Sequence, residues 1–323
     1  MDVLIYANPY SGSKDNLRLV GRLESALVAE GMEPEVVWKL PGRAEQLLEV
    51  GHGLKAVVAA GGDGSINTTV NLMRETEHLH LPFATLPVGT ENLFAKQFGY
   101  DVTRPEAIAA AIAGGRTEAV DLGEVRPMVE GRPDDAGGRL FTLMASAGFD
   151  AAVVHKLDAW RTDLPDGALQ RVSKISYVAP VTRSLLGYGF PRVTLSADGR
   201  EVTGSQAYVF NLPQYGGNIG IGRHTRVGDG QLHWVVFEKP GRLRLFAYHA
   251  LCLINRHLQT STVHHGHAAE VTIASSDGHG HTDQVDAAAH APVQADGDPA
   301  GQTPQHFRVL PGALNVVRVR SEG

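Results

Sequence analysis

The stretch Ala59-Ala-Gly-Gly-Asp-Gly-Ser-Ile-Asn67 decides the fold predicted for this 323-residue chain. The apolar run Ala56–Ala59 that leads into it predicts a short buried strand. Beyond the glycines, Ile66, Val70 and Met73 share one face of a predicted helix. A glycine-rich turn from a strand into a helix presents backbone N–H groups to an anion at the positive end of the helix dipole. On this stretch alone, a phosphate-binding loop and an ordinary tight turn are equally good interpretations.

One acidic residue, Asp63, lies inside this turn. A carboxylate at that place repels a phosphate group unless a cation lies between the two. The turn therefore indicates a nucleotide phosphate that is bound together with Mg²⁺.

Strand-like and helix-like patterns alternate over residues 1–122, which predicts a parallel α/β sheet flanked by helices. The predicted strands are Val3–Ala7, Glu35–Trp38, Ala56–Ala60 and Phe83–Leu86, and the predicted helices are Leu17–Glu30, Ala44–Val50 and Pro105–Ala113. The first, third and fourth strands end in loops rich in Gly, Ser, Thr and Asn. Because ligands bind at the carboxyl ends of parallel strands, these loops should converge on one crevice. That expectation favours the phosphate-binding interpretation.

The pattern changes after Val120–Val125 to short strand-like runs separated by turns, which predicts an antiparallel sheet or sandwich. The runs are Arg139–Ala147, Val193–Ser196, Glu201–Asn211, Leu232–Phe237, Ala269–Ala274, Ala291–Ala295 and Asn315–Arg320. Two helical stretches, about 151–186 and 243–258, interrupt them. The sequence thus predicts two domains that divide near residue 122.

Composition narrows the class of protein. A net charge of −6 gives no basic field for nucleic acid, and the single cysteine excludes an intramolecular disulfide. The N-terminus lacks the pattern of a signal peptide, and no apolar run approaches the ~20 residues of a membrane-spanning helix. We therefore expect a cytoplasmic protein with Cys252 in its core.

Three motifs occur in order at the predicted strand ends: Asn8-Pro-Tyr-Ser-Gly12, Gly61-Gly-Asp-Gly-Ser-Ile-Asn67 and Pro87-Val-Gly-Thr-Glu-Asn-Leu-Phe-Ala95. Together they resemble the diacylglycerol kinase catalytic-domain family of lipid kinases, to which sphingosine and ceramide kinases are related. Further matches extend the resemblance over nearly the whole chain, at Val120–Gly123, Asn211, Gly216-Gly217, Asp229-Gly230 and Asp296-Gly-Asp298.

The resemblance implies an ATP-binding α/β domain of residues 1–122, joined by a returning segment at about 305–323. It also implies a β-rich lipid domain of residues 123–304, with the active site in the cleft between the two domains. Residues implied to contact ATP are Asn8, Ser11, Gly61, Gly62, Gly64, Ser65, Asn67 and Thr90. Turn formation is the alternative role for Asn8 and Ser11, and a helix N-cap is the alternative for Thr90.

The resemblance also implies acidic sites. Asp63 and Asp121 belong to a network around Mg²⁺, and Asp229 belongs to a secondary Mg²⁺ site with backbone carbonyls near Arg226 and Gln231. The family has a further Asp in this network at the position of Leu93, which cannot ligate a metal.

The resemblance places the catalytic base in Asp296-Gly-Asp298, where the family has Asp-Gly-Glu. Asp296 matches fully and is the first choice; Asp298, one methylene shorter than the family's Glu, is the second. A tight Asp-Gly turn between two strands is the alternative interpretation.

These features predict ATP- and Mg²⁺-dependent phosphorylation of a diacylglycerol-like lipid hydroxyl by in-line transfer, in lipid metabolism, with transient contact to a membrane surface. A homodimer stays open as the oligomeric state. Alternatives are an NAD kinase-like enzyme, because NAD kinases share the Gly-Gly-Asp-Gly loop, and a catalytically weak nucleotide- or lipid-binding protein, because of Leu93 and Asp298. The His/Asp-rich segment 275–290 is predicted to be a solvated loop.

Overall fold

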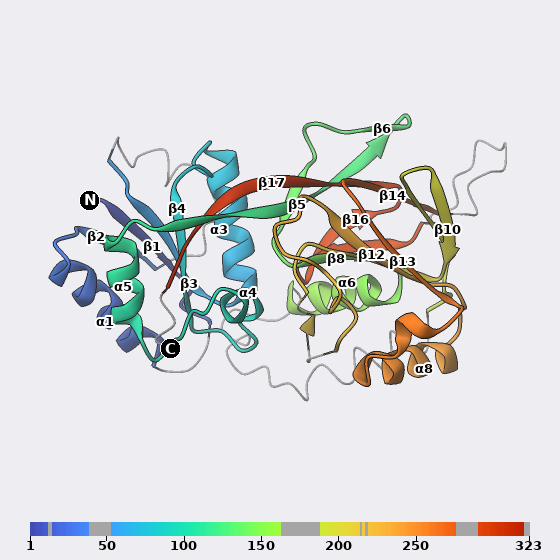
Figure 1. Cartoon of the computed structure of the whole chain (residues 1–323), viewed down its shortest axis with the longest axis horizontal. Coiled ribbons are helices and arrows are strands. Elements are labelled where there is room, and N and C mark those ends of the chain that lie inside the picture. The colour runs from blue at the N-terminus through green and yellow to red at the C-terminus, as the bar shows by residue number, and fades with distance from the viewer. Residues whose placement is uncertain are drawn as a thin grey trace. The chain divides into compact units, whose positions relative to one another are not determined.

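The computed structural model describes residues 1–11, 15–38, 53–162, 188–213, 215–216, 219–275 and 290–319. The predicted helix Ala44–Val50, and all but the ends of the predicted loop 275–290, lie outside these residues. The chain forms two compact units, Met1–Leu122 with Pro311–Gly323, and Gly123–Leu310. Strands β5 (Thr117–Val129) and β17 (Gln305–Val317) contribute residues to both units (Figure 1).

The first unit contains a parallel sheet in the order β2-β1-β3-β4-β17. Its strands are β1 (Val3–Ala7), β2 (Pro34–Val37), β3 (Ala56–Gly61), β4 (Pro82–Pro87) and the end of β17. Every residue of β1 and β3 is buried, as their uninterrupted apolar runs predict for strands covered on both faces. The predicted parallel α/β sheet is confirmed.

The described part of the first unit contains the helices α1 (Asn16–Ala29), α3 (Asp63–Glu75), α4 (Leu93–Gln97) and α5 (Pro105–Ala113). Helix α1 packs beside α5, where Arg22 forms an ion pair with Glu106 (Figure 1). Helix α3 begins at Asp63 and not at the predicted Ser65, because the N–H groups of Ser65 and Ile66 both donate to the carbonyl of Gly62.

The second unit consists mainly of two antiparallel sheets. One has the order β13-β12-β11-β8-β15-β16, and in the other β10-β9-β14 pairs with β17, which also pairs with β5. Their strands, apart from β5 and β17, are β6 (Arg132–Pro133), β7 (Arg139–Phe141), β8 (Met144–Ala147), β9 (Val193–Ala197), β10 (Arg200–Gly204), β11 (Gln206–Phe210), β12 (Leu232–Phe237), β13 (Val263–Ala268), β14 (Glu270–Ser275), β15 (Pro292–Ala295) and β16 (Asp298–Gln302). Apolar side chains from both sheets share one core, for example Leu195 and Ile273 with Val209 and Val236. The predicted sandwich is therefore confirmed.

Several predicted elements of this unit need correction. The run Arg139–Ala147 is two strands, β7 and β8, in different sheets, and Glu201–Asn211 is likewise divided into β10 and β11. In each case the chain turns between the strands, at Thr142–Leu143 and at Ser205. Strands β13 and β16 were not predicted, because histidines fill the first and Asp, Pro and Gly the second.

The described residues of the second unit also include two α-helices. Helix α6 (Phe149–Thr162) packs on β15 and β16. Helix α8 (Arg242–Leu253) is followed by a 3₁₀ turn, His257–Gln259. Among the described residues, no helix has the length and apolar character needed to cross a membrane.

Candidate functional site

The glycine turn after β3 lies beside the loop that follows β1. The N–H of Asn8 donates to the carbonyl of Ala60, and Asn8 Nδ2 donates to Ser65 Oγ at 3.1 Å. Asn8 also orders its own loop, because its Oδ1 accepts the N–H of Tyr10 and its carbonyl accepts the N–H of Ser11. Asn8 and Ser11 thus make the predicted turn, and their contact with a nucleotide stays a prediction.

The loop after β4 approaches the same turn still more closely. A Cβ added to Gly89 would lie 2.4 Å from the Cα of Gly62, so this approach requires a glycine at position 89. Asn92 fixes the loop by donating from Nδ2 to the carbonyls of Pro87 and Gly89, both at 2.9 Å. The predicted convergence of the three strand-end loops is confirmed.

Asp63 joins the glycine turn to helix α4. Its two carboxylate oxygens accept the backbone N–H groups of Leu93 and Phe94, each at 3.0 Å. This bond pair caps the helix N-terminus from a distant part of the sequence. The alternative interpretation of Thr90 as the cap is wrong, because Asn92 is the N-cap residue and Asp63 supplies the acceptors.

The glycine turn itself suits an anion. The first N–H groups of a helix have no acceptor within the helix, and at the start of α3 they belong to the glycine turn. Gly64 is exposed and a Cβ there would meet open space, whereas a Cβ on Gly61 would collide with Ser65 at 2.2 Å. At Gly64 the turn is therefore open to solvent, and no side-chain atom stands between an anion and the backbone of this residue.

Other predicted nucleotide contacts are placed differently by the fold. Asn67 is fully buried and accepts a bond from Asn71, so its position favours a role in holding helix α3. Ser65 is nearly buried, with its hydroxyl bonded to Asn8. Thr90 is exposed in the loop after β4.

The acidic residues predicted to bind Mg²⁺ do not form a cage of their own. Among the described residues, no group of three or more His, Cys, Asp or Glu side chains could hold a metal ion. Asp121 is buried and accepts the N–H of Gly312 at 2.8 Å. Each oxygen of Asp63 keeps a second lone pair beside its N–H bond, so Asp63 fits a Mg²⁺ ion that arrives with nucleotide phosphates and keeps several waters.

In the second unit, Asp296 and Gly297 form the two-residue turn of the β15–β16 hairpin, with φ of 50° and 86°. These positive φ values are those of a type I′ turn, so the predicted Asp-Gly turn is confirmed. The Asp296 carboxylate accepts four bonds, from the N–H groups of Thr142, Leu143 and Met144 and from the Thr142 hydroxyl. Burial raises the pKa of the Asp296 carboxyl, and these four bonds act in the opposite direction.

Asp298, the next residue but one, is more accessible. Its side chain is 38% exposed, and Oδ2 pairs with Arg139 Nη2 at 2.5 Å. A carboxylate has room for about four bonds, so Asp296 has little capacity left for a substrate hydroxyl, and Asp298 is the better placed of the two.

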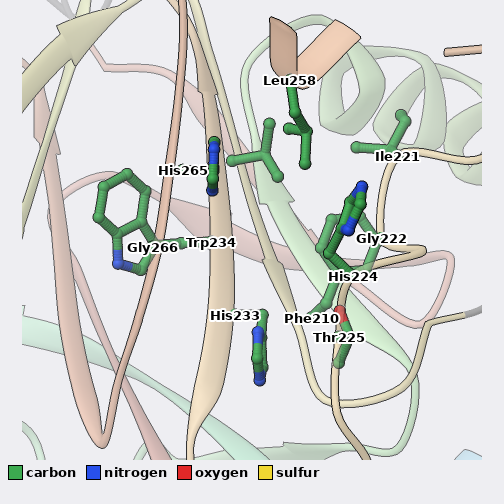
Figure 2. A pocket seen from close by; sticks show the side chains of 11 residues that line it. Phe210, Ile221, Gly222, His224, Thr225, His233, Trp234, Leu258, His265 and Gly266 are labelled. Carbon is green, nitrogen blue, oxygen red and sulfur yellow. The ribbon is translucent and has the colours of Figure 1, made fainter. Parts of the chain in front are cut away.

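Asp229 lies in a turn, where Oδ1 accepts the N–H of Gln231 and Oδ2 lies 3.0 Å from His233 Nε2. Its role in a secondary Mg²⁺ site stays a prediction. Three histidines, His264, His265 and His267, lie on β13, where His265 lines a cavity of about 30 Å³ with His224 and His233 (Figure 2). That volume holds about one water molecule.

Sequence reasoning gave no role to several residues that shape these sites. Arg139 holds Asp298, and Gly89 permits the contact with Gly62. Beneath the hairpin, Gln294 accepts the N–H of Gly297 and donates to Asp150, which also accepts from Tyr215. Positive φ at an Asn, as at Asn92, is a recognisable turn feature. The pairs Arg139–Asp298 and Gln294–Asp150, in contrast, join residues more than 100 positions apart and leave no local signal.

Comparisons with known proteins agree with this geometry. The model of the diacylglycerol kinase catalytic domain matches residues 2–125, and that of the YegS C-terminal NAD kinase beta sandwich-like domain matches residues 144–318. A diacylglycerol kinase of Mycobacterium tuberculosis is 26% identical over 98% of this chain and 95% of its own length. A probable lipid kinase YegS-like protein of Stenotrophomonas maltophilia is 31% identical over 57% of this chain and 59% of its own.

The fold has a solved counterpart as well. A crystal structure of a diacylglycerol kinase from Bacillus anthracis aligns with a TM-score of 0.64 at 16% identity, over 98% of this chain and 96% of that one. The parallel sheet with its glycine-rich strand end lies in the part of the chain that the first family model matches, and most of the antiparallel sandwich lies in the part that the second matches. The chain belongs to the diacylglycerol kinase catalytic-domain family, with a C-terminal domain of the YegS type.

Proposed function

We propose that this protein is an ATP- and Mg²⁺-dependent lipid kinase that phosphorylates the hydroxyl of a diacylglycerol-like acceptor. The observation that carries the proposal is the meeting of three strand-end loops around Gly62, with Asp63 capping α4 and Gly64 exposed. This arrangement leaves a positive helix end free of side-chain bulk, as a nucleotide phosphate requires. The relatives that match the chain are named as lipid kinases, which supports a lipid as acceptor.

The proposed chemistry is a direct transfer. The hydroxyl proton of the acceptor passes to a carboxylate. The hydroxyl oxygen of the acceptor then forms the new bond to the γ-phosphorus of ATP, and ADP leaves. We assign the proton to Asp298, with Arg139 holding that side chain, and assign Asp296 to anchoring the hairpin on the 142–144 segment. A bound Mg²⁺ would supply charge neutralisation, with Asp63 as its first candidate ligand and Asp121 as its second.

The domain roles follow from this proposal. The unit that contains residues 1–122 would bind ATP, and the unit of residues 123–310 would bind the lipid.

A second candidate function rests on Leu93. This residue is the first of α4 and its N–H bonds to Asp63, at the place where the family has an acidic side chain. A protein with one acid fewer around its metal would bind ATP and transfer phosphate slowly or not at all.

The test is transfer of labelled phosphate from ATP by the purified protein to diacylglycerol, to a sphingoid base and to NAD, with ATP binding measured in parallel. Labelling of a lipid supports the proposal. Labelling of NAD alone refutes the lipid assignment, and ATP binding without any transfer supports the second candidate. If Leu93 limits turnover, Leu93→Asp should raise the rate, and an unchanged rate would remove Leu93 as the explanation.

A further inference from the structure

Helix α8 (Arg242–Leu253) has apolar side chains on two opposite sides. One side carries Leu245, Tyr248 and Cys252, which are buried in the second unit, and the ring of Tyr248 packs on Phe237 with centroids 4.8 Å apart. This side packs the helix against the unit, at whose outer edge α8 lies (Figure 1).

The opposite side is also apolar, although solvent surrounds it. Leu243 is 86% exposed, Phe246 60%, Leu253 61% and Ile254, just past the helix, 63%. At 100° per residue these four side chains fall within a sector of about 100°, roughly opposite the buried side. Ala250 also falls within that sector and Ala247 lies about 20° beyond its edge, and both are exposed. A continuous apolar strip of this kind is typical of an interaction surface and not of an ordinary solvated helix face.

The charged side chains in the segment 239–269, which contains this strip, are all basic. No Asp or Glu occurs between Glu238 and Glu270, whereas Lys239, Arg242, Arg244 and Arg256 do, in a chain whose net charge is −6. Lys239 pairs with Glu238, and the three arginines are exposed at the two ends of the helix. Tyr188 and Phe190 line a surface pocket with Arg242 and Leu243, which adds aromatic side chains next to the basic end.

We infer that this face of α8 docks on an anionic lipid bilayer, lying in the plane of the interface. The apolar strip would enter the acyl boundary, and the arginines would contact lipid phosphates. A symmetric dimer through this face would bring its arginines against the same arginines of the other copy, so charge complementarity favours an anionic bilayer over a second copy. The inference rests on the proposed function in one respect, since a kinase of membrane lipids must reach a bilayer.

The test compares wild-type protein with Leu243→Glu/Phe246→Glu and with Arg242→Gln/Arg244→Gln. Binding is measured by flotation with vesicles of phosphatidylcholine alone and of phosphatidylcholine with about a third phosphatidylglycerol. We expect wild-type protein to bind the anionic vesicles, and binding to weaken with salt. Loss of the two arginines should weaken binding about 30-fold, at roughly fivefold for each charge. The glutamate variant should lose binding almost completely.

Val28→Glu is the matched control, because Val28 is 58% exposed on another amphipathic helix, α1. This variant should bind vesicles as the wild-type protein does. Circular dichroism and thermal unfolding check that each variant is folded. Equal binding by wild-type protein and the glutamate variant would overturn the inference. So would a dimer in sedimentation that the glutamate variant abolishes while its vesicle binding is unchanged, because a second copy would then cover the face.

Transfer activity separates this inference from the proposed function. The glutamate variant should retain wild-type activity on a water-soluble, short-chain diacylglycerol. It should lose activity on diacylglycerol presented in vesicles. Vesicle binding through α8 without transfer to any lipid would leave the inference standing and refute the kinase. Phosphate transfer to vesicle lipids at the same rate in wild-type protein and the glutamate variant would refute the docking of α8 and leave the kinase proposal standing.

Discussion

At the scale of the residue, the two acids of the β15–β16 hairpin have different surroundings. The Asp296 carboxylate receives four bonds from residues 142–144, whereas the Asp298 side chain pairs with Arg139 and is partly exposed. The sequence motif ranks Asp296 first, because Asp296 matches the family fully, and so it points to the residue whose oxygens are less available. The difference arises from contacts about 150 residues apart, which no local pattern encodes.

Asp298→Asn should reduce phosphate transfer at least ~100-fold, because the amide cannot accept the acceptor's proton. Unfolding in urea should change by less than about 1 kcal/mol, since the lost ion pair is partly exposed. The control is Asp135→Asn, which breaks another Asp–Arg pair, with Arg126, at a side chain 93% exposed. Full activity in Asp298→Asn would show that the base is elsewhere.

Asp296→Asn should lower the free energy of unfolding by about 3 kcal/mol, because one carboxylate oxygen becomes an NH₂ group facing N–H donors. Asp198→Asn offers a matched comparison: Asp198 and Gly199 form the β9–β10 turn with φ of 48° and 73°, but Asp198 is exposed. That variant should stay within about 0.5 kcal/mol of wild type. Equal urea midpoints for the two variants would argue against an anchoring role for Asp296.

At the scale of the element, the start of helix α3 combines an exposed glycine with a predicted anion site. Gly64→Ala should stabilise the free protein by up to about 1 kcal/mol, because the new Cβ meets open space and alanine favours the helix. The same Cβ should weaken ATP binding, since it stands where a phosphate would approach. The combination of higher stability and lower affinity is the expected signature.

The control for this prediction is Gly21→Ala in α1, where a Cβ also meets open space. It should stabilise the protein without affecting ATP, as measured by thermal unfolding and isothermal titration. If Gly64→Ala binds ATP as tightly as wild type, the glycine turn is not the phosphate site.

The elements of the first unit were largely predictable because each carries its own signal. Helix α5 begins and ends where its proline and alanine pattern predicts, and β1 and β3 follow from continuous apolar runs. Strand β13 escaped prediction because its residues 264–267 are His, His, Gly and His, and its pairing with β12 decides its conformation. The cap of α4 escaped for a related reason, since Asp63 lies thirty residues before it.

At the scale of the whole molecule, the division into two units was anticipated by the change from strand–helix alternation to short strands near residue 122, and the units divide at Leu122. The order of strands within the sheets could not be predicted from the sequence, because strands such as β9 and β14 pair across many intervening residues. The resemblance to the family assigned more of the candidate site residues than the periodicity of the sequence did.

Stability should depend on pH through His257, which is buried against the carbonyl of Ile221. Burial lowers its pKa, with smaller contributions from His224 and His265. Because the unfolded chain binds the proton more readily, the free energy of unfolding should fall as the pH drops below about 6.5, by at most ~1.4 kcal/mol for each pH unit. Urea unfolding between neutral and mildly acidic pH measures this dependence, and His257→Gln should flatten it. If the free energy of unfolding depends on pH equally in that variant and in the wild type, other titratable groups cause the effect.

The most direct test of the account is transfer of the γ-phosphate of ATP to diacylglycerol, measured for wild-type protein and Asp298→Asn in the same preparation and with Mg²⁺ present. The account predicts a labelled lipid with the wild type, a loss of at least ~100-fold with the variant, and equal ATP binding by both. Wild-type protein that binds ATP but labels no lipid acceptor would contradict it.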